Sequence, residues 1–218
     1  MYKFIKETIK KFFPFLSKEP KRYSYLFRVI NEIKPKNIME VGVWNGNRAE
    51  QMIETAKKFW PASEVTYYGF DLFEEMIKEL MTKEVVGDAS KLNVLPFMQE
   101  IKKKLSKTGS HIKLFKGNTL EILPKVVHSL PKMDFIFIDG GHSIQTITSD
   151  WYYAEHLMHK DSIVIFDDYY FDKDDIGAKS VVEKIDKSRF DVKILPIRDR
   201  FNNKGGLLSI NFVRVKRK

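Results

Sequence analysis

Short apolar segments that end at polar residues alternate with helical segments along most of this chain, and this alternation limits the fold more than any other feature. Strands are expected at 37–41, 65–70, 111–115, 133–138 and 162–166, and helices at 48–59, 119–127, 144–158 and 177–187. Strands alternating with helices of this length form parallel βαβ units. Two further β-like runs, 192–197 and 207–215, flank the turn-like segment NNKGG at 202–206. The sequence therefore predicts a doubly wound α/β fold with a seven-stranded, mostly parallel sheet and an antiparallel strand from a C-terminal hairpin.

The first 36 residues differ in composition from the rest of the chain. They hold ten lysines and arginines against three glutamates. Apolar residues at helical spacing predict one helix at 2–16 and a second at 22–34. We therefore divide the chain into an N-terminal basic helical extension, 1–36, and a main domain, 37–218. For the first helix three interpretations stay open: packing on the domain, contact in a homo-oligomer, or peripheral contact of residues 1–20 with an anionic membrane.

Composition excludes several classes of protein. The 218 residues include no cysteine, which rules out disulfides, thiolate zinc sites and cysteine nucleophiles. No segment reaches the roughly 18 apolar residues of a membrane span, and no signal peptide is evident, so a cytoplasmic protein is expected. The net charge of +9 is concentrated at the two ends. No nucleic-acid-binding motif accompanies these basic residues, so nucleic acid is not expected as a partner.

Acidic residues follow two of the predicted strands. FIFIDGGHS, 135–143, reaches Asp139, and SIVIFDDYY, 162–170, reaches Asp167 and Asp168. Ligands of open α/β sheets bind at the carboxyl ends of the strands. Three clustered carboxylates repel one another unless a cation lies between them, and Mg²⁺ or Mn²⁺ accepts such oxygen ligands. The three aspartates therefore predict a metal site. The alternative is a turn in which only one acid of the 167–168 pair faces the site.

A glycine-bearing turn follows the first strand, in the run EVGVWNG at 40–46. A strand, such a turn and a helix N-terminus let the backbone approach a ligand closely. The glycine spacing differs from the G-x-G-x-x-G of dinucleotide-binding proteins, which disfavours a nicotinamide enzyme. Asp71 ends the second strand, where an acid can accept hydrogen bonds from ribose hydroxyls. Asn118 precedes a helix and could contact an adenine edge, although both residues also fit the role of a helix N-cap.

The E-x-G-x-x-x-G pattern, the acid after the second strand and the G-N before the third helix resemble class I S-adenosylmethionine-dependent methyltransferases. GFDLFEE, IDGGHS, FDD and IGAKSVVEKI, in this order, resemble more specifically the metal-dependent sugar O-methyltransferases of the macrocin O-methyltransferase type. The resemblance implies a Rossmann-like fold and S-adenosylmethionine as cofactor. It assigns Glu40 and Gly42 to the methionine end, Asp71 to the ribose and Asn118 to the adenine, where family members often carry Asp. The full set of residues that it places at the cofactor is Glu40, Gly42, Trp44, Gly46, Asp71, Leu72, Asn118, Thr119 and Asp139.

The chemistry of methyl transfer to a hydroxyl assigns the remaining roles. An alcohol is a weak nucleophile, so its proton must be removed, and a bound metal would lower the pKa of a coordinated hydroxyl. His142 has a suitable ordinary pKa near ~6.5; in the family that the sequence resembles, the matching Asp and His positions are both candidate bases, so His142 is the first candidate and Asp139 is the second. His142 could instead be a partly exposed helix cap. We also expect residues 169–176 to form a lid in which Tyr169, Tyr170 and Phe171 stack on the acceptor, with 74–108 as a further cover.

The sequence therefore predicts an S-adenosylmethionine-dependent O-methyltransferase that uses Mg²⁺ or Mn²⁺ and methylates a hydroxyl of a sugar or glycoside-type small molecule. One alternative is a metal-independent methyltransferase of the same fold that acts on another small molecule or a lipid. The other alternative is a non-catalytic basic module that binds membranes or nucleic acid through its charged ends.

Overall fold

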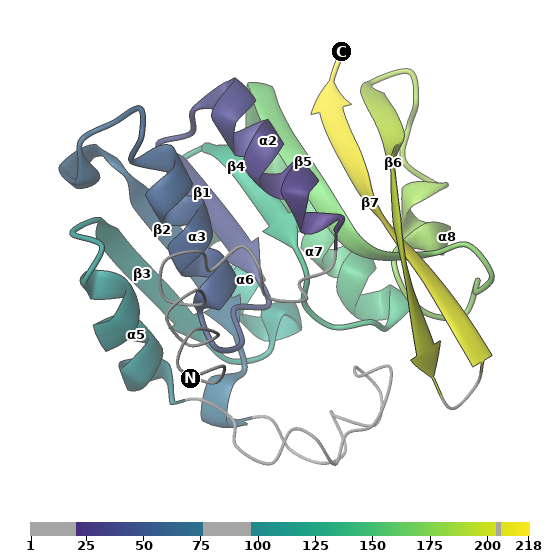
Figure 1. The fold of residues 1–218 in the computed structure, drawn as a ribbon, viewed down its shortest axis with the longest axis horizontal. Helices are drawn as coiled ribbons and strands as arrows, with labels where there is room; N and C mark the ends of the chain where they lie inside the picture. The colour runs from purple at the N-terminus through teal and green to yellow at the C-terminus, as the bar shows by residue number, and fades with distance from the viewer. Residues whose placement is uncertain (1–20, 76–96, 204–205) are drawn as a thin grey trace, which may run out of the picture.

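A seven-stranded sheet forms the centre of the computed structural model, which describes residues 21–75, 97–203 and 206–218 (Figure 1). The strand order is β3-β2-β1-β4-β5-β7-β6. Neighbours from β3 to β5 pair in parallel, whereas β7 is antiparallel to both β5 and β6. The strands are β1 Asn37–Val41, β2 Thr66–Asp71, β3 His111–Lys116, β4 Met133–Ile138, β5 Met158–Tyr170, β6 Phe190–Asn203 and β7 Gly206–Arg217. The predicted mostly parallel sheet with its C-terminal hairpin is confirmed.

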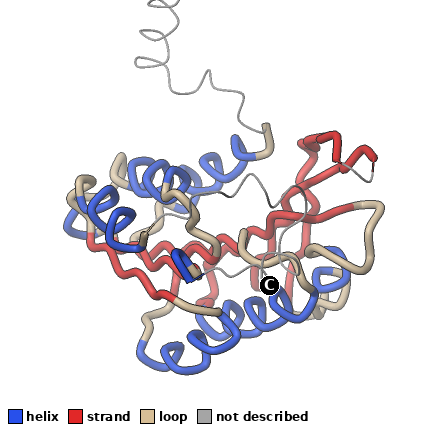
Figure 2. The backbone as a smooth tube through the Cα atoms, turned by 90° about the horizontal axis from the view of Figure 1, so that it is seen from below, coloured by secondary structure: helices blue, strands red, loops and turns tan. Residues whose placement is uncertain are grey.

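Helices cover both faces of the sheet, above and below the strands in Figure 2. They are α2 Tyr23–Ile33, α3 Asn47–Ala56, α5 Met98–Ser106, α6 Thr119–Val126, α7 Ile144–Leu157 and α8 Lys179–Val182. One apolar core lies between the sheet and α2, α3 and α5, and the other lies between the sheet and α6, α7 and α8. Strands buried on both faces need continuous apolar runs. In β4, Phe135 and Phe137 enter the first core and Ile136 and Ile138 enter the second.

The second predicted helix, 22–34, is confirmed as α2 and is part of the main core. Its side chains Leu26, Phe27, Val29 and Ile30 are buried against α3 and the sheet. The described residues of the N-terminal segment therefore pack as one body with the domain, and the boundary at residue 36 stays a prediction. The predicted helix at 2–16 and most of the 74–108 stretch lie outside the described residues. No helix among the described residues is long and apolar enough to cross a membrane.

Three elements differ clearly from their predicted lengths, and one of them is β6, which spans Phe190–Asn203 rather than 192–197. The helix predicted at 177–187 is reduced to α8; the chain continues in tighter turns, with Lys184 N–H to the Val181 carbonyl and Ile185 N–H to the Val182 carbonyl, and the Asp186 carboxylate then accepts hydrogen bonds from the backbone N–H and the hydroxyl of Ser188. Such a local bond to the backbone favours a turn over a helix. Strand β5 runs on to Tyr170 rather than ending at Phe166, because β7 pairs with its last residues.

Candidate active site

The acids of β5 lie in a β-bulge rather than at the end of the strand. Parallel pairing with β4 ends at Phe166, and antiparallel pairing with β7 resumes at Tyr169. Asp167 and Asp168 together face the single residue Phe212 of β7, and Asp168 has a positive φ of 55°. A bulge of this kind re-aims side chains. The two acids consequently have different partners.

Asp167 is bound by the guanidinium group of Arg22. The Nε and Nη2 atoms of Arg22 each donate a 2.8 Å hydrogen bond, one to each carboxylate oxygen. The Tyr23 hydroxyl donates to Oδ2 at 3.0 Å, and the Asp168 backbone N–H donates to Oδ1 at 2.7 Å. Both Arg22 and Asp167 are buried. Both oxygens of Asp167 therefore accept hydrogen bonds from the protein.

Arg22 has a second carboxylate partner and an aromatic surround. Its Nη1 lies 3.3 Å from Oδ2 of Asp199 in β6, and that oxygen also accepts the Arg22 backbone N–H at 2.9 Å. The guanidinium carbon lies 4.8 Å from the ring centre of Tyr23 and 5.4 Å from that of Phe212, within the range of cation–π attraction. Burial alone would lower the pKa of Arg22, but the charge of Asp167 and its hydrogen bonds raise the pKa above its usual value. The arginine is a permanent buried cation.

Asp168 is paired with His142. The Nε2 atom of His142 lies 2.7 Å from Oδ2 of Asp168, and the Tyr170 hydroxyl donates to Oδ1 at 2.7 Å. Burial opposes ionisation, but the charge and hydrogen bond of His142 lower the pKa of Asp168 below its usual value. Gly177 fixes the two segments to each other, because its backbone N–H donates to the His142 carbonyl and a Cβ there would lie 2.5 Å from the Asp168 carbonyl oxygen. His142 is therefore held against an ionised carboxylate.

Asp139 follows β4 and adjoins the loop after β1. Its backbone N–H donates to the Val41 carbonyl at 2.8 Å, and the Tyr23 hydroxyl lies 3.4 Å from its Oδ2. Burial first, and then the charges of Asp167 and Asp168, raise the pKa of Asp139 well above its usual value. Gly42 has a φ of 92°, and a Cβ at this position would lie 2.0 Å from the Asp139 carbonyl oxygen. Only glycine allows these two loops to approach so closely.

This arrangement does not form the predicted metal site of Asp139, Asp167 and Asp168. The oxygens of Asp167 accept bonds from Arg22 and Tyr23, and those of Asp168 contact His142 and Tyr170. Across residues 21–75, 97–203 and 206–218, no three histidine, cysteine or acidic side chains are grouped in a way that could hold a metal ion. The residues present do not fit a divalent cation, because an arginine already supplies the positive charge.

Three of the predicted cofactor residues, Trp44, Gly46 and Asp71, lie in the loop after β1 and at the end of β2. Asp71 accepts the backbone N–H of Trp44 at 2.7 Å through Oδ2 and that of Phe73 at 2.9 Å through Oδ1, and so connects the two loops. Trp44 has a positive φ of 45° and an exposed side chain. Gly46 also has a positive φ, 69°, and directly precedes α3. The turn after β1 therefore ends at a helix N-terminus, as the sequence predicts.

Glu40 lies within the core rather than among the exposed residues at this edge of the sheet. Its side chain is fully buried in β1 and accepts a hydrogen bond from the Tyr67 hydroxyl. Its Oε1 has no hydrogen-bond partner among the described residues. Burial is the main cause that raises the pKa of Glu40 to about 8. An unpaired buried carboxylate oxygen is costly, so this atom is suited to a donor from a ligand.

The third loop provides the remaining predicted cofactor residues. Asn118 is the N-cap of α6, and its side-chain oxygen accepts the Leu120 backbone N–H at 3.0 Å. Thr119, the first residue of that helix, is buried, and Leu72 is half-buried after β2. The capping role of Asn118 is present, and its predicted contact with adenine stays a prediction.

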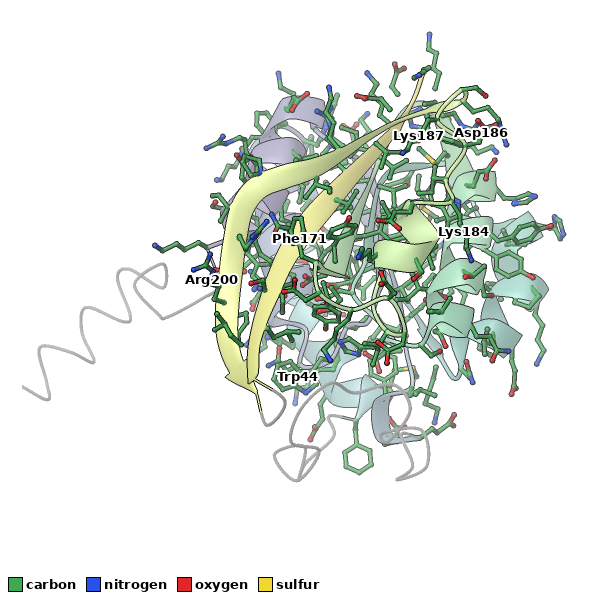
Figure 3. All side chains as sticks on the ribbon, turned by 90° about the vertical axis from the view of Figure 1, so that its right-hand side faces the viewer. Trp44, Phe171, Lys184, Asp186, Lys187 and Arg200 are labelled. Atoms are coloured by element: carbon green, nitrogen blue, oxygen red, sulfur yellow. The ribbon has the colours of Figure 1, made fainter. Side chains whose placement is uncertain are left out.

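The structure corrects the predicted aromatic lid. Tyr169 and Tyr170 belong to β5 and are buried, so they do not cover an acceptor. Phe171 is partly exposed, and the Arg198 guanidinium lies 3.8 Å from its ring centre. In Figure 3, Phe171 lies beside the β6–β7 hairpin and Trp44 lies below it. Of the three predicted stacking residues, only Phe171 has exposed ring surface.

Sequence reasoning did not identify four residues of the site: Arg22, Tyr23, Tyr67 and Asp199. Arg22 belongs to a basic segment that resembles a solvated surface, and Asp199 belongs to the polar run RDR. A signal for Tyr67 was available, because the buried acid Glu40 requires a donor from a neighbouring strand. No local pattern distinguishes Arg22 from the other basic residues around it.

A family described as a methyltransferase domain matches residues 39–169 of the sequence. The chain belongs to this family. Its match covers β1 to most of β5, which carry Gly42, Asp71, Asp139 and the acids of the bulge. No curated protein matches the chain in sequence.

Solved structures of methyltransferases share this fold. The O-methyltransferase TomG from Streptomyces achromogenes, in complex with S-adenosylmethionine, has a TM-score of 0.60 at 15% identity and covers 97% of this chain and 96% of its own. An O-methyltransferase from Bacillus cereus, in complex with S-adenosylhomocysteine, has a TM-score of 0.56 at 12% identity and covers 92% and 82%. The O-methyltransferase NovP has a TM-score of 0.58 at 16% identity and covers 88% and 79%. The family match confirms the prediction of a methyltransferase domain, and the solved structures confirm its fold.

Proposed function

We propose that this methyltransferase transfers the methyl group of S-adenosylmethionine to a hydroxyl group of a sugar-like small molecule. The observation that carries the proposal is the contact between the two halves of the site. The glycine turn after β1 touches the backbone of Asp139, and the pair of His142 and Asp168 follows in the adjoining loop and strand. In the proposed complex the glycine turn after β1 faces the cofactor, and His142 therefore provides a proton acceptor close to it.

The chain's own residues account for the proton transfer. Bound S-adenosylmethionine supplies an activated methyl group, and its leaving thioether needs no proton. The acceptor hydroxyl must lose one, and we assign this to His142. Because the pKa of Asp168 is lowered, its carboxylate stays ionised near neutral pH, orients the imidazole and stabilises the imidazolium that forms. Asp139, whose pKa is raised by burial, is the second candidate for the base.

We place the ribose of the cofactor at the two loops that Asp71 connects. Each oxygen of Asp71 accepts one backbone N–H, and a carboxylate has about four acceptor positions in all. Ribose hydroxyl groups can donate hydrogen bonds to the acceptor positions of Asp71 that remain. The resemblance assigns Glu40 to the methionine end; its Oε1 has no partner among the described residues but is buried in β1, so this contact requires that the cofactor reach it from the side of the glycine turn. We assign the adenine to the loop of Asn118.

The proposal further specifies that the hydroxyl group belongs to a sugar-like molecule. Support comes from the motif resemblance to sugar O-methyltransferases and from exposed aromatic surface on the same side of the molecule, at Trp44 and Phe171 (Figure 3). Aromatic faces pack well on the apolar faces of sugar rings. The acids of the site do not fit a divalent cation, because Arg22 and His142 already contact them, so the metal-independent form of the reaction is favoured, and activity measured in a chelator tests it.

Substitution of His142 tests the proposed base. We expect His142→Ala to lower kcat by about 100-fold or more, because general-base catalysis contributes roughly that much, and to leave cofactor affinity within about threefold. The measurement is transfer of labelled methyl from S-adenosylmethionine to a panel of glycosides. His156→Ala is the matched control, since His156 is exposed on α7. A His142→Ala enzyme with wild-type kcat would overturn the assignment.

A further inference from the structure

We propose that Arg22 is the resident cation of this site: its guanidinium takes the place of the divalent ion that Asp139, Asp167 and Asp168 would otherwise require, so methyl transfer by this chain needs no metal. The proposal rests on the proposed function, and it concerns the charge balance of the same site. Arg22 is a positioning residue in it, because it acts through Asp167 and Tyr23.

The hydrogen bonds of Asp167 are the first argument. A bidentate arginine contact, at 2.8 Å on each side, uses both carboxylate oxygens in the plane where a metal would bind. The Tyr23 hydroxyl adds a third bond at 3.0 Å to the same group. A divalent cation on either oxygen would lie beside the guanidinium and would be repelled by it. Metal binding at Asp167 therefore requires that Arg22 first be displaced.

The attachment of Arg22 to three elements is the second argument. Asp199 of β6 accepts the backbone N–H groups of Lys21 and Arg22 and also contacts the guanidinium. This carboxylate therefore sits at the N-terminus of α2, where a negative charge is favourable. The Arg22 side chain is buried and spans from β6 to β5. Displacing it would leave two buried carboxylates without their cation, which is strongly unfavourable.

The position of Tyr23 is the third argument. Its hydroxyl lies 3.0 Å from Asp167 and 3.4 Å from Asp139, so it bridges the acids that follow β4 and β5. Its ring packs edge-on against Phe212 at 5.2 Å and lies beneath the guanidinium of Arg22. A neutral donor between two carboxylates, next to a fixed cation, reduces their repulsion without a metal. Since an arginine does not coordinate the acceptor hydroxyl as a metal does, deprotonation falls to His142.

Manganese binding to the intact protein is the direct test. We expect electron paramagnetic resonance titrations of the wild-type protein, with S-adenosylhomocysteine present, to show no Mn²⁺ site that depends on Asp167, and methyl transfer to run at the same rate in chelator as in Mg²⁺. A stoichiometric Mn²⁺ site that is lost in Asp167→Asn would overturn the proposal. Activity abolished by the chelator and restored by Mg²⁺ would overturn it as well.

Replacement of Arg22 gives the complementary result. Arg22→Ala removes the cation and leaves its carboxylate partners, so we expect this variant to bind Mn²⁺ at least tenfold more tightly than the wild type. Arg28→Ala, which removes a charge from the same helix, should leave Mn²⁺ affinity unchanged. A folded Arg22→Ala protein with no gain in Mn²⁺ affinity would contradict the proposal. If Arg22→Ala does not fold, the wild-type titration alone decides.

These measurements separate this proposal from the proposed function. Affinity for S-adenosylhomocysteine, measured in the same samples, tests the methyltransferase assignment alone, whereas Mn²⁺ affinity tests the role of Arg22 whether or not an acceptor is found.

Discussion

Glu40 carries a carboxyl group into a part of the sheet that water does not reach. Its only hydrogen-bond donor among the described residues is Tyr67 on the neighbouring strand β2, and burial raises its pKa to about 8. The folded protein therefore keeps the Glu40 proton through the pH range in which an unfolded chain has lost it. A neutral carboxyl group is tolerated in the core, and ionisation of this group opposes folding.

This residue predicts a pH dependence of stability. The pKa is about 8 in the folded protein against 4.5 for the ordinary group, so the unfolded state binds fewer protons between these values, and the free energy of unfolding falls as pH rises. The slope from Glu40 is at most about 1.4 kcal/mol per pH unit. Urea unfolding at pH 5.5 and pH 8 should show that Glu40→Gln removes this slope, while Glu54→Gln on the exposed side of α3 retains it. Parallel pH profiles for wild type and Glu40→Gln would contradict the account.

Residue patterns identified some parts of the site and missed others for a physical reason. Gly42, Asp71, Asp139 and the bulge acids are recognisable because loops after parallel strands meet at one edge, so their place in the sequence fixes their place in space. Arg22 precedes the first strand of that pattern, and its partner Asp199 lies 177 residues away in the chain. Such a contact depends on how α2 and β6 pack, which no local pattern specifies.

At the scale of elements, Phe212 of β7 marks the point where the sheet bends. Strand β5 places two residues opposite it, and β6 places three, Leu195 to Ile197, between its paired positions. Both neighbours therefore bulge at the same level, which increases local twist. This bend brings Asp199 on one side and Asp167 on the other to the same arginine. The bulges depend on how the strands pair across the hairpin, which the sequence pattern does not specify. The strands were therefore predicted from the sequence, but the bulges were not.

Truncation of Phe212 should affect both stability and the site. Its ring is fully buried and packs edge-on against Phe137 and Tyr23 at 5.6 Å and 5.2 Å, so Phe212→Ala should cost about 3–5 kcal/mol of unfolding free energy. Phe190→Ala is the matched control, because that ring is equally buried but packs against Trp151. Urea unfolding should show similar losses for both, and methyl transfer at a temperature where both are folded should fall only in Phe212→Ala. Equal methyl-transfer activity in the two variants would show that the packing of Phe212 at the bulge does not affect the active site.

At the scale of the whole molecule, α2 covers one face of the sheet together with α3 and α5, and Arg22, the residue directly before α2, supplies the cation of the site. Figure 1 shows this helix lying across the sheet beside α3. Its residues Leu26 and Ile30 are fully buried in the same core as α3 and β4. Of the predicted basic extension, the described helix Tyr23–Ile33 therefore packs in the core of the domain through an apolar stripe at helical spacing.

Removal of the first 36 residues should therefore unfold the domain. Burial of four apolar side chains on α2 contributes about 1.5–3 kcal/mol each, and their sum is as large as the roughly 5–15 kcal/mol that typically stabilises a whole domain. A chain that starts at residue 37 should lack a cooperative thermal transition, whereas a chain that starts at residue 21 should keep one. A cooperative transition in the shorter chain, within a few degrees of the longer one, would show that α2 is dispensable for the fold.

Calorimetric titration of S-adenosylmethionine into the full chain tests most directly whether the edge formed by the loops after β1, β2 and β4 is a cofactor site. We expect binding at one site per chain, with affinity reduced at least tenfold in Asp71→Asn, because the amide presents one acceptor oxygen instead of two. Asp161→Asn, an exposed acid before the apolar part of β5, should bind as the wild type does. Absence of binding to the folded wild-type protein would contradict the central claim, and equal affinity in Asp71→Asn would place the cofactor elsewhere.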